Sequence, residues 1–191
     1  MNFRDYRERQ CAPAQRERPL GGGRVRAIES SMRILSGGLD DPRVRTLLEH
    51  HARTARMETA PGSAHALDLE GLKSPDVKFW SAWDGDTLVG VGALKRLSES
   101  HGEIKSMHTV QGRRRAGAGS AILRHMIDVA RTLGMTRLSL ETGSWSYFHP
   151  ARALYHKHGF VECPPFGDYT SDPNSIFMTL VLRVGCGAGS E

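Results

Sequence analysis

The sequence predicts a single folded domain of the α/β class (α+β by some schemes), in which helices cover the faces of a mixed sheet. Three observations predict it. The chain has 191 residues and a mass of 21.1 kDa, a length typical of one domain. Its composition, 39% hydrophobic and 25% charged, is that of a globular protein. Strand-like and helix-like segments alternate along it, as they do in such layered domains.

The domain begins with a strand and a helix. Residues 33–35 are predicted as a short strand. Asp41 and Pro42 mark the start of a helix, because a capping acid and a proline in the first turn are both favoured there. Side chains at helical spacing follow, namely Val44, Leu47, Leu48, His51 and Ala55. Residues 59–76 are rich in Pro, Gly and Ser, and we expect a loop there with a short helix around residues 66–72.

A hairpin and a third strand come next. Residues 77–83 alternate as a strand does, and residues 88–94 form the returning strand. The sequence Asp84-Gly85-Asp86 between them is typical of a hairpin turn. Residues 103–110 are predicted as another strand after a polar break.

The second half of the domain alternates helices and strands. Apolar side chains at helical spacing end at Gly134, and they are Ile122, Leu123, Met126, Ile127, Ala130 and Leu133. Residues 137–141 are predicted as a strand and residues 150–158 as a short helix that Gly159 ends. Residues 176–181 are predicted as the last strand.

The positive charge gathers at the N-terminal end. The chain has a formal charge of +5, and residues 1–31 hold seven arginines and four acids, or +3 of that total. This segment has too few large apolar residues to order itself. We expect residues 1–31 to be a disordered basic extension, solvated and without a function of its own. The alternatives are an arm that touches anionic polymers, a presequence, and a start codon placed too early, with Met32 as the true start.

Cysteine usage and hydropathy bear on the compartment. The three cysteines, Cys11, Cys163 and Cys186, form no C-x-x-C pair, which argues against a disulfide scaffold or a zinc ribbon and favours a reducing cytosol. No apolar run approaches the roughly 18 residues of a membrane helix, and the N-terminus lacks the apolar stretch of a signal peptide. We therefore expect a cytoplasmic protein without a membrane partner.

The most informative segment leads from the strand at 103–110 into the following helix. Three consecutive arginines, 113–115, precede Gly117-Ala118-Gly119. A helix that opens on glycine leaves backbone N–H groups aimed at solvent, at the positive end of the helix dipole. This pattern favours a cradle for a pyrophosphate; the alternative is an Arg- and Gly-rich helix start on the surface. A nucleotide P-loop and a dinucleotide fingerprint are excluded, because no Gly-Lys-Ser/Thr follows and Ile122 stands where a third glycine is needed.

Two motifs carry a family resemblance. The run R-x-x-G-x-G, Arg114 to Gly119, resembles the cofactor motif of the GNAT superfamily of acetyl-CoA-dependent N-acetyltransferases, in particular a branch of small bacterial proteins. About forty residues later, Ala151-x-x-Leu154-Tyr155-x-x-x-Gly159-Phe160 resembles the family's second motif. The resemblance implies a mostly antiparallel sheet of about six to seven strands flanked by about four helices. It implies an acetyltransferase domain over residues 32–184, followed by a flexible tail over residues 185–191.

The resemblance also implies the cofactor contacts. Met107, His108 and Thr109 would pair through their backbone with the pantetheine arm of acetyl-CoA. The pyrophosphate would lie on the loop and first helical turn, comprising Arg114, Arg115, Ala116, Gly117, Ala118, Gly119 and Ser120. Phe148 stands where many members of the family carry an asparagine, so a side-chain hydrogen bond expected there is in doubt.

Two residues are candidates for proton transfer. Strict alternation places Glu103, Lys105, Met107 and Thr109 on one face of their strand, and Ile104, Ser106, His108 and Val110 on the other. Glu103 occupies the offset of the glutamate base in family members that have one, and we assign it that role, directly or through a water. Alternatively, it is a solvated acid or a partner of Lys105 or Arg96. Tyr155 is carried over from the family as the acid that protonates the CoA thiolate; otherwise it is a core tyrosine.

The acceptor is the least determined part of the prediction. Aromatic side chains that could wall an acceptor pocket are Trp80, Trp83, Trp145, Tyr147, Phe148, Phe166 and Tyr169. Trp80 and Trp83 cannot both face one side of a strand. Asp168 or Asp172 could attract a cationic amine, while Arg96 or Lys105 could hold a carboxylate. His156 and His158 point to different sides of a helix, and we predict no metal.

These residues predict an N-acetyltransferase that moves the acetyl group of acetyl-CoA to a primary amine of a small molecule or peptide. Two other functions stay open: a catalytically silent acyl-CoA-binding module, and a nucleic-acid binder that uses the basic arm. Retention of both Glu103 and Tyr155 argues against the silent module. Dimerisation is common among similar proteins, and nothing in these residues establishes it.

Overall fold

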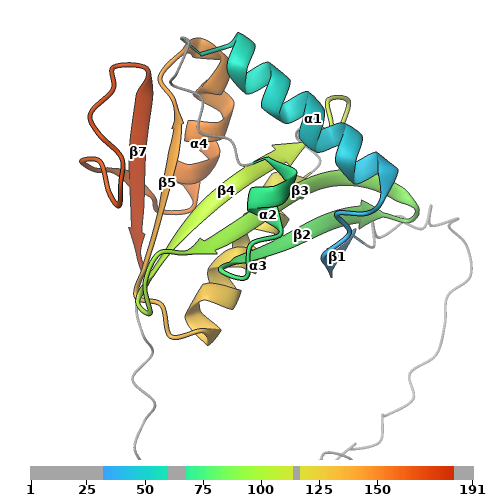
Figure 1. The fold of residues 1–191 in the computed structure, drawn as a ribbon, viewed down its shortest axis with the longest axis horizontal. Helices are drawn as coiled ribbons and strands as arrows, with labels where there is room; N and C mark the ends of the chain where they lie inside the picture. The colour runs from blue at the N-terminus through green and yellow to red at the C-terminus, as the bar shows by residue number, and fades with distance from the viewer. Residues whose placement is uncertain (1–31, 60–67, 114–116, 183–191) are drawn as a thin grey trace, which may run out of the picture.

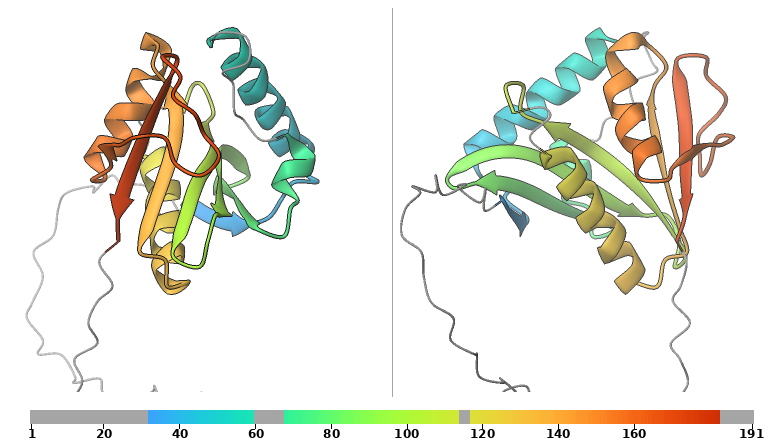
Figure 2. Two further views of the ribbon diagram at one scale, coloured as in Figure 1. Left: turned by 60° about the vertical axis from the view of Figure 1, so that its left-hand side comes forward. Right: turned by 180° about the vertical axis from the view of Figure 1, so that it is seen from behind.

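The computed structural model describes residues 32–59, 68–113 and 117–182. Within them, seven strands form one sheet in the order β1-β2-β3-β4-β5-β7-β6. Neighbouring strands are antiparallel except for β4 and β5, which run parallel. Helices α1 and α2 cover one face of the sheet, and α3 and α4 cover the other (Figures 1 and 2). The predicted α/β domain with a mixed, mostly antiparallel sheet and four helices is confirmed.

The N-terminal elements follow their local sequence signals. Strand β1 spans Met32–Ser36, and helix α1 spans Pro42–Met57. The Asp41 side chain caps α1 by accepting from the Arg43 backbone N–H at 2.8 Å. The short helix predicted around residues 66–72 is α2, Leu69–Leu72; residues 60–67 lie outside the described part.

The remaining strands and helices agree with the predicted order. Strands β2, Val77–Asp84, and β3, Thr87–Arg96, form the predicted hairpin, and the turn places Gly85 at a φ of 56°. The other elements are β4 (His101–Thr109), α3 (Ala118–Thr132), β5 (Arg137–Gly143), α4 (His149–Lys157) and β7 (Ser175–Val181). Two short elements were not predicted: a 3-10 turn at Ser146–Phe148 and the edge strand β6 at Val161–Glu162. None of the described helices is long and apolar enough to cross a membrane.

The sheet separates two apolar clusters. On one face, α3 and α4 pack around Ile122, Met126 and Leu138, and on the other, α1 and α2 pack Val44 and Leu72 against the sheet. Trp80 belongs to the first cluster and Trp83 to the second. The prediction that these two tryptophans face opposite sides is confirmed, and both are core residues, because each is at most 7% exposed.

Strands β4 and β5 separate part of the way along their length. They pair only where His101, Gly102 and Glu103 meet Arg137, Leu138 and Ser139. Beyond this point β4 continues to Thr109 and β5 to Gly143, and the two strands diverge, as Figure 1 shows. Where two parallel strands separate, their facing edges no longer form backbone hydrogen bonds with each other. The sheet therefore opens in the middle of the domain.

The predicted alternation along β4 is wrong beyond Lys105. Ser106 has a φ of 49°, and the β3–β4 register shifts between Val91 and Ala93. Lys105 is paired with Ala93 and His108 with Val91, two residues of the cluster under α1, so both side chains lie on that face. Met107 and Thr109 instead face Gly119 on α3. A β-bulge adds one residue to a strand, which is why the parity changes there.

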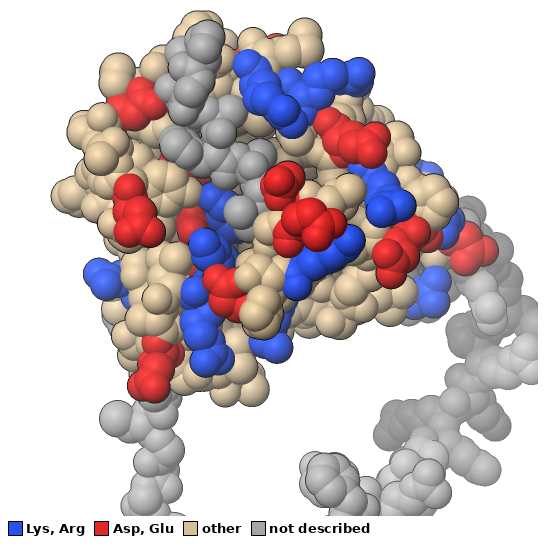
Figure 3. Space-filling model, viewed as in Figure 1, with Lys and Arg blue, Asp and Glu red and all other residues tan. Residues whose placement is uncertain are grey.

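The surface over α1 and α2 carries charges of both signs. Lys and Arg side chains alternate with Asp and Glu across this face (Figure 3). A surface that binds nucleic acid would gather one sign along one face. The basic extension predicted at residues 1–31 and the tail predicted at residues 185–191 lie outside the described residues, as do Arg114, Arg115 and Ala116.

Candidate functional site

The opening between β4 and β5 is the floor of a cavity of about 680 Å³. Its wall combines residues from α1, the second half of β4, the start of α3, the end of β5, and α4 with the turn before it. Among them are the site residues predicted as Met107, His108, Thr109, Gly117, Ala118, Gly119, Ser120, Phe148 and Tyr155. One cavity therefore gathers two motifs that are about forty residues apart in the chain.

The first turn of α3 forms one end of this cavity. Gly117 is the N-cap, with a φ of 87° and no side-chain cap, a conformation that favours glycine. The next glycine, Gly119, is needed for a different reason: a Cβ there would lie 3.2 Å from a methyl of Leu154 on α4. The backbone N–H groups of this turn face the cavity at the positive end of the helix dipole. They suit an anion such as a pyrophosphate.

Basic side chains surround the same end. Arg113 lies on the cavity wall and forms a partly exposed ion pair with Asp84 at 3.6 Å. The Ser120 Oγ and His158 Nε2 atoms are hydrogen-bonded at 2.9 Å. Burial lowers the pKa of His158, and the charges of Arg124 and Lys157 lower it further. With that imidazole neutral and Arg113 matched by Asp84, the positive charge at this end comes from Lys157 and the N-terminus of α3.

Glu103 lies in a buried ionic network on the α1 face. Its carboxylate is 3.1 Å from Lys105 Nζ and accepts a hydrogen bond from the Tyr169 hydroxyl at 2.7 Å. Lys105 also donates to the Tyr169 hydroxyl at 2.7 Å. Glu103 is only 3% exposed, so the alternative of a solvated acid is wrong. The alternative of a Lys105 partner is confirmed, and Lys105, not Glu103, reaches the cavity wall.

Tyr155 lies on α4 beneath the opening and is 7% exposed. Burial raises the pKa of its phenol well above the usual range, and the negative charge of Glu141 raises it further. The hydroxyl is therefore protonated at any physiological pH. Its ring packs 5.9 Å from that of Phe160, so the residue is both a core tyrosine and part of the cavity wall.

Glu141 is a site residue that the sequence analysis missed. It lies on β5 two residues after the last β4–β5 pair, reaches the cavity wall, and accepts a hydrogen bond from the Ser175 hydroxyl at 2.7 Å. Its charge raises the pKa of Tyr155 and of Tyr169. The alternation of Leu138 and Leu140 with Ser139 and Glu141 indicates that Glu141 points away from the face that the two leucines share. Nothing in the sequence indicates that β4 has separated from β5 at this position.

The predicted aromatic wall is only partly present. Tyr147 and Phe148 line the cavity, with their rings 5.0 Å apart. The Phe148 ring lies over Gly143, where a Cβ would be 2.3 Å from it. Trp80 and Trp83 are core residues, and Trp145 is half exposed. Phe166 and Tyr169 pack with Phe177 in a separate aromatic cluster, with Phe166 and Tyr169 centroids 5.2 Å apart and Tyr169 and Phe177 centroids 5.4 Å apart.

Three histidines meet between α1 and β4. The His108 ring lies 4.9 Å from that of His51 and 5.9 Å from that of His50. Burial lowers the pKa of His51 to about 4, and repulsion from His50 adds to the effect. His51 lines the cavity as a neutral imidazole. His156 and His158 do diverge, as predicted, because His156 bonds the Phe160 carbonyl and His158 bonds Ser120.

Comparisons with known proteins agree with the geometry. Residues 44–160 match the model of the acetyltransferase (GNAT) family. The chain is 49% identical to the uncharacterized N-acetyltransferase YsnE of Bacillus subtilis over 151 residues, which is 79% of this chain and 100% of that protein. It is 46% identical to the uncharacterized N-acetyltransferase YedL of Escherichia coli over 78% of this chain and 94% of that protein.

A solved structure of another protein has the same fold as this chain. A GNAT family acetyltransferase from Elizabethkingia anophelis with acetyl-CoA bound aligns with a TM-score of 0.60 and 18% identity. The alignment covers 81% of this chain and all of that one. At this identity the likeness concerns the fold alone.

Proposed function

The chain belongs to the acetyltransferase (GNAT) family of acyltransferases, and from that premise we propose that it transfers the acetyl group of acetyl-CoA to a primary amine of a small molecule or peptide. The amine attacks the thioester directly. Glu103 accepts the proton that the amine loses, and Tyr155 protonates the departing thiolate. One observation carries the proposal: a single cavity joins the glycine-opened turn of α3 to Tyr155 across the parted strands.

The cofactor contacts follow from the elements around that cavity. The turn from Gly117 to Ser120 would hold the pyrophosphate through its backbone N–H groups. In the described part of the chain, the edge of β4 at Met107, His108 and Thr109 has no strand partner on the β5 side, and it would pair with the amides of the pantetheine arm. Phe148 would pack against this arm. Arg114, Arg115 and Ala116 belong to the same sequence motif, and the two guanidinium groups would add positive charge for the phosphates.

The proposed reaction conserves every proton. The amine nitrogen forms a bond to the carbonyl carbon, and the bond from that carbon to sulfur breaks. Glu103 gains one proton, through a water because Lys105, and not Glu103, lines the cavity. Tyr155 gives one proton to sulfur, and exchange with solvent restores both groups. A phenol with a raised pKa stays protonated until the thiolate develops, which suits a general acid.

The experiment is a screen for CoA release across amines, peptides and amino acids, followed by Glu103→Gln. We expect kcat to fall by about 100-fold and the acidic limb of the pH profile to change. Glu99→Gln is the matched control, because Glu99 is exposed on the loop before β4 and outside the cavity wall. An unchanged profile in Glu103→Gln would assign the base to another group. Absence of CoA release with every amine would contradict the proposed reaction.

We also propose that residues 32–184 suffice for this activity. A chain without residues 1–31 contains every described residue and should retain acetyl transfer. If the basic arm binds nucleic acid, the same deletion should abolish retention on heparin, or on a DNA fragment, without lowering turnover. Loss of turnover in the shortened chain would contradict the proposed boundary.

A further inference from the structure

The bulge of β4 lies on the wall of the cavity. Between the pairs that Lys105 and His108 form with β3, strand β4 has two residues, Ser106 and Met107, and β3 has one, Gly92. Two residues opposite one define a β-bulge, and the extra residue is left out of the backbone ladder. Ser106 lies at this point and lines the cavity.

Ser106 carries two costs in this position. It is the one non-glycine residue with a positive φ in the described part of the chain, at 49°, and it is 7% exposed. Its hydroxyl has no hydrogen-bond partner among the described residues. Glycine is the usual residue at a bulge with positive φ and would remove both the strain and the unsatisfied hydroxyl. A serine there indicates that the hydroxyl is used when a ligand is bound.

The hydroxyl can turn toward a ligand in the cavity. Its oxygen is covered in this structure, while the residue itself lies on the cavity wall. Rotation about the single Cα–Cβ bond moves the oxygen among three staggered positions and leaves the backbone in place. No described residue holds the hydroxyl by a hydrogen bond, so this rotation breaks none of those bonds.

Ser106 lies between the proposed cofactor contacts and the proposed proton acceptor. On one side, a methyl of Thr109 lies 3.6 Å from the place that a Cβ on Gly119 would take, which ties this part of β4 to the glycine-opened turn. On the other side, Lys105 lines the cavity and lies 3.1 Å from Glu103. If the first group holds the cofactor and the second receives the proton of the amine, the carbon that joins the two substrates lies beside Ser106.

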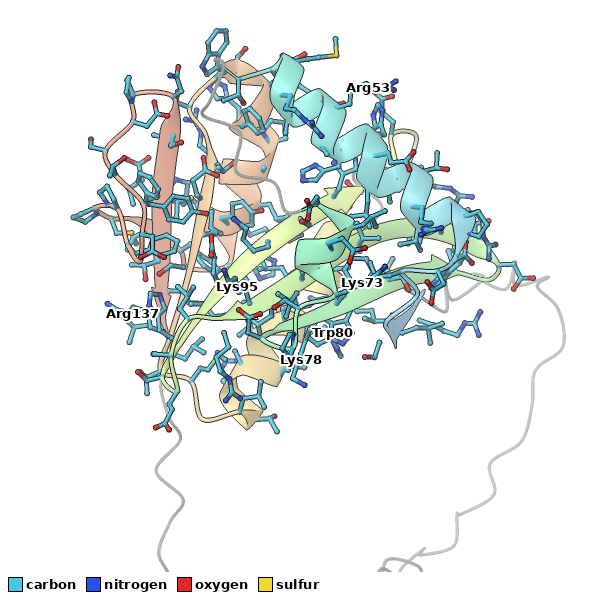
Figure 4. All side chains as sticks on the ribbon, viewed as in Figure 1. Arg53, Lys73, Lys78, Trp80, Lys95 and Arg137 are labelled. Carbon is cyan, nitrogen blue, oxygen red and sulfur yellow. The ribbon has the colours of Figure 1, made fainter. Side chains whose placement is uncertain are left out.

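The cationic side chains of this region are engaged or distant. Lys105 donates to Glu103 at 3.1 Å and to the Tyr169 hydroxyl at 2.7 Å. Lys95 and Arg137 lie at the end of the sheet where β4 and β5 are still paired, away from the opening (Figure 4). A thioester carbonyl is uncharged before the amine adds to it. A neutral hydroxyl can donate to this oxygen without bringing another charge into the cavity.

We propose that the Ser106 hydroxyl donates a hydrogen bond to the thioester carbonyl oxygen of acetyl-CoA. This inference rests on the proposed function. The neutral amine adds to the carbonyl carbon, and one electron pair of the C=O bond moves to oxygen; the pair returns when the bond from carbon to sulfur breaks. The hydrogen bond strengthens while the oxygen carries negative charge. The serine keeps its proton throughout and forms no covalent bond.

The first test compares acetyl-CoA with S-ethyl-CoA, a thioether that lacks the carbonyl. By calorimetry, the parent chain should bind acetyl-CoA about threefold to tenfold more tightly. Ser106→Ala and Ser106→Gly should both abolish this preference. Ser139→Ala is the matched control, because the Ser139 hydroxyl is also buried but is hydrogen-bonded to His101 and Thr179 and is not on the described cavity wall. It should keep the preference of the parent.

The second test measures the stability of the unliganded chain. Ser106→Ala should not lower the Tm, because no hydrogen bond within the described structure is lost, whereas Ser139→Ala should lower it. Ser106→Gly should raise the Tm by about 3 °C, because glycine adopts positive φ without strain. Equal falls in Ser106→Ala and Ser139→Ala would show that the Ser106 hydroxyl already has a partner in the free chain, and would overturn the inference.

The third test observes the carbonyl itself. Acetyl-CoA labelled with ¹³C at the carbonyl is bound to each chain, and its C=O stretch is followed by isotope-edited infrared spectroscopy. A hydrogen bond lowers this frequency, so the stretch should lie higher in Ser106→Ala and Ser106→Gly than in the parent and in Ser139→Ala. The same frequency in all four chains would overturn the inference.

The outcomes separate this inference from the proposed function. A parent chain that binds no CoA would contradict both, whereas one that binds acetyl-CoA and S-ethyl-CoA equally would overturn only the role of Ser106. Equal losses for CoA, acetyl-CoA and S-ethyl-CoA in Ser106→Ala would assign the hydroxyl to the shared pantetheine arm and overturn it too. In turnover assays, Ser106→Ala should lower kcat by about 100-fold; a change confined to the KM of the amine would assign the hydroxyl to the acceptor instead.

Discussion

The two ends of the cavity, proposed to bind the cofactor and the acceptor, are built in different ways. The proposed cofactor end consists mainly of backbone groups: a glycine-opened helix turn and the edge of a strand. At the proposed acceptor end, Lys105 on β4 and Glu141 on β5 line the cavity, and Lys105 is held by Glu103 and by Tyr169 from the loop before β7. Backbone recognition needs only a short motif, whereas side-chain recognition needs several distant segments brought together.

The comparison also explains why the two ends differ in how they tolerate change. A helix N-terminus keeps its N–H groups whatever the neighbouring side chains are. A buried ion pair is compatible with a stable fold only while both partners are present, because one partner alone is an uncompensated buried charge. Substitutions at the acceptor end should therefore disturb the fold as well as the function, and substitutions at the cofactor end should disturb mainly binding.

The largest effect is expected at the buried pair. Lys105→Met leaves Glu103 without its cation and should lower the free energy of unfolding by about 3 kcal/mol. Lys73→Met removes the same charge from the exposed Lys73–Glu70 pair and should cost under about 0.5 kcal/mol. Urea denaturation checks both. Adding Glu103→Gln to Lys105→Met should recover part of the loss; equal losses at the two lysines would mean that burial does not distinguish the pairs.

The second effect concerns the cofactor end. Gly117→Glu places a carboxylate at the N-terminus of α3 and should weaken CoA binding by about 100-fold, because it repels the phosphates. Gly134→Glu is the matched control: Gly134 has a φ of 76°, and a Cβ there also meets nothing within 4 Å, but it lies beyond the other end of α3. Calorimetry should show loss of affinity only in Gly117→Glu. Similar losses in both variants would trace the effect to backbone strain.

The third effect tests the link between the ends. Tyr155→Phe should lower kcat by about 30-fold with little change in CoA affinity, since we propose that the phenol acts on the thiolate and not on the phosphates. CoA-release kinetics and calorimetry on the same preparation separate the two quantities. Undiminished turnover would make Tyr155 a packing residue alone.

The smallest effect is a dependence of stability on pH. The pKa of His51 is about 4 in the folded chain and 6.5 ordinarily, so between these values the unfolded chain binds more protons and stability falls as pH falls. We expect a loss of about 1–2 kcal/mol between pH 7 and pH 4 from this residue, discounted because it is only half-buried. His51→Phe should show a shallower decline in urea denaturation. A parallel decline in both chains would remove His51 as the cause.

Most elements were predictable because their signals are local. Asp41 and Pro42 start α1, Gly134 ends the region of α3, and the turn at Gly85 joins β2 to β3. Each signal acts within a few residues, through a cap, a fixed φ or a permitted positive φ. The edge strand β6 was not predicted because two residues show no periodicity.

The candidate site likewise has a part that local sequence signals predict and a part that depends on distant segments. The sequence alone determined the glycine-opened turn, which we propose binds phosphate, and the position of Tyr155 on its helix, since main-chain geometry at a glycine-opened helix follows from nearby residues. Only the tertiary structure decided which side chains of β4 and β5 reach the cavity. The bulge at Ser106 reverses the direction of Met107 and His108, and the parting of β4 and β5 exposes Glu141. Tyr169 meets Glu103 across 66 residues of chain. Strand register and partner choice depend on the whole sheet, so no short segment encodes them.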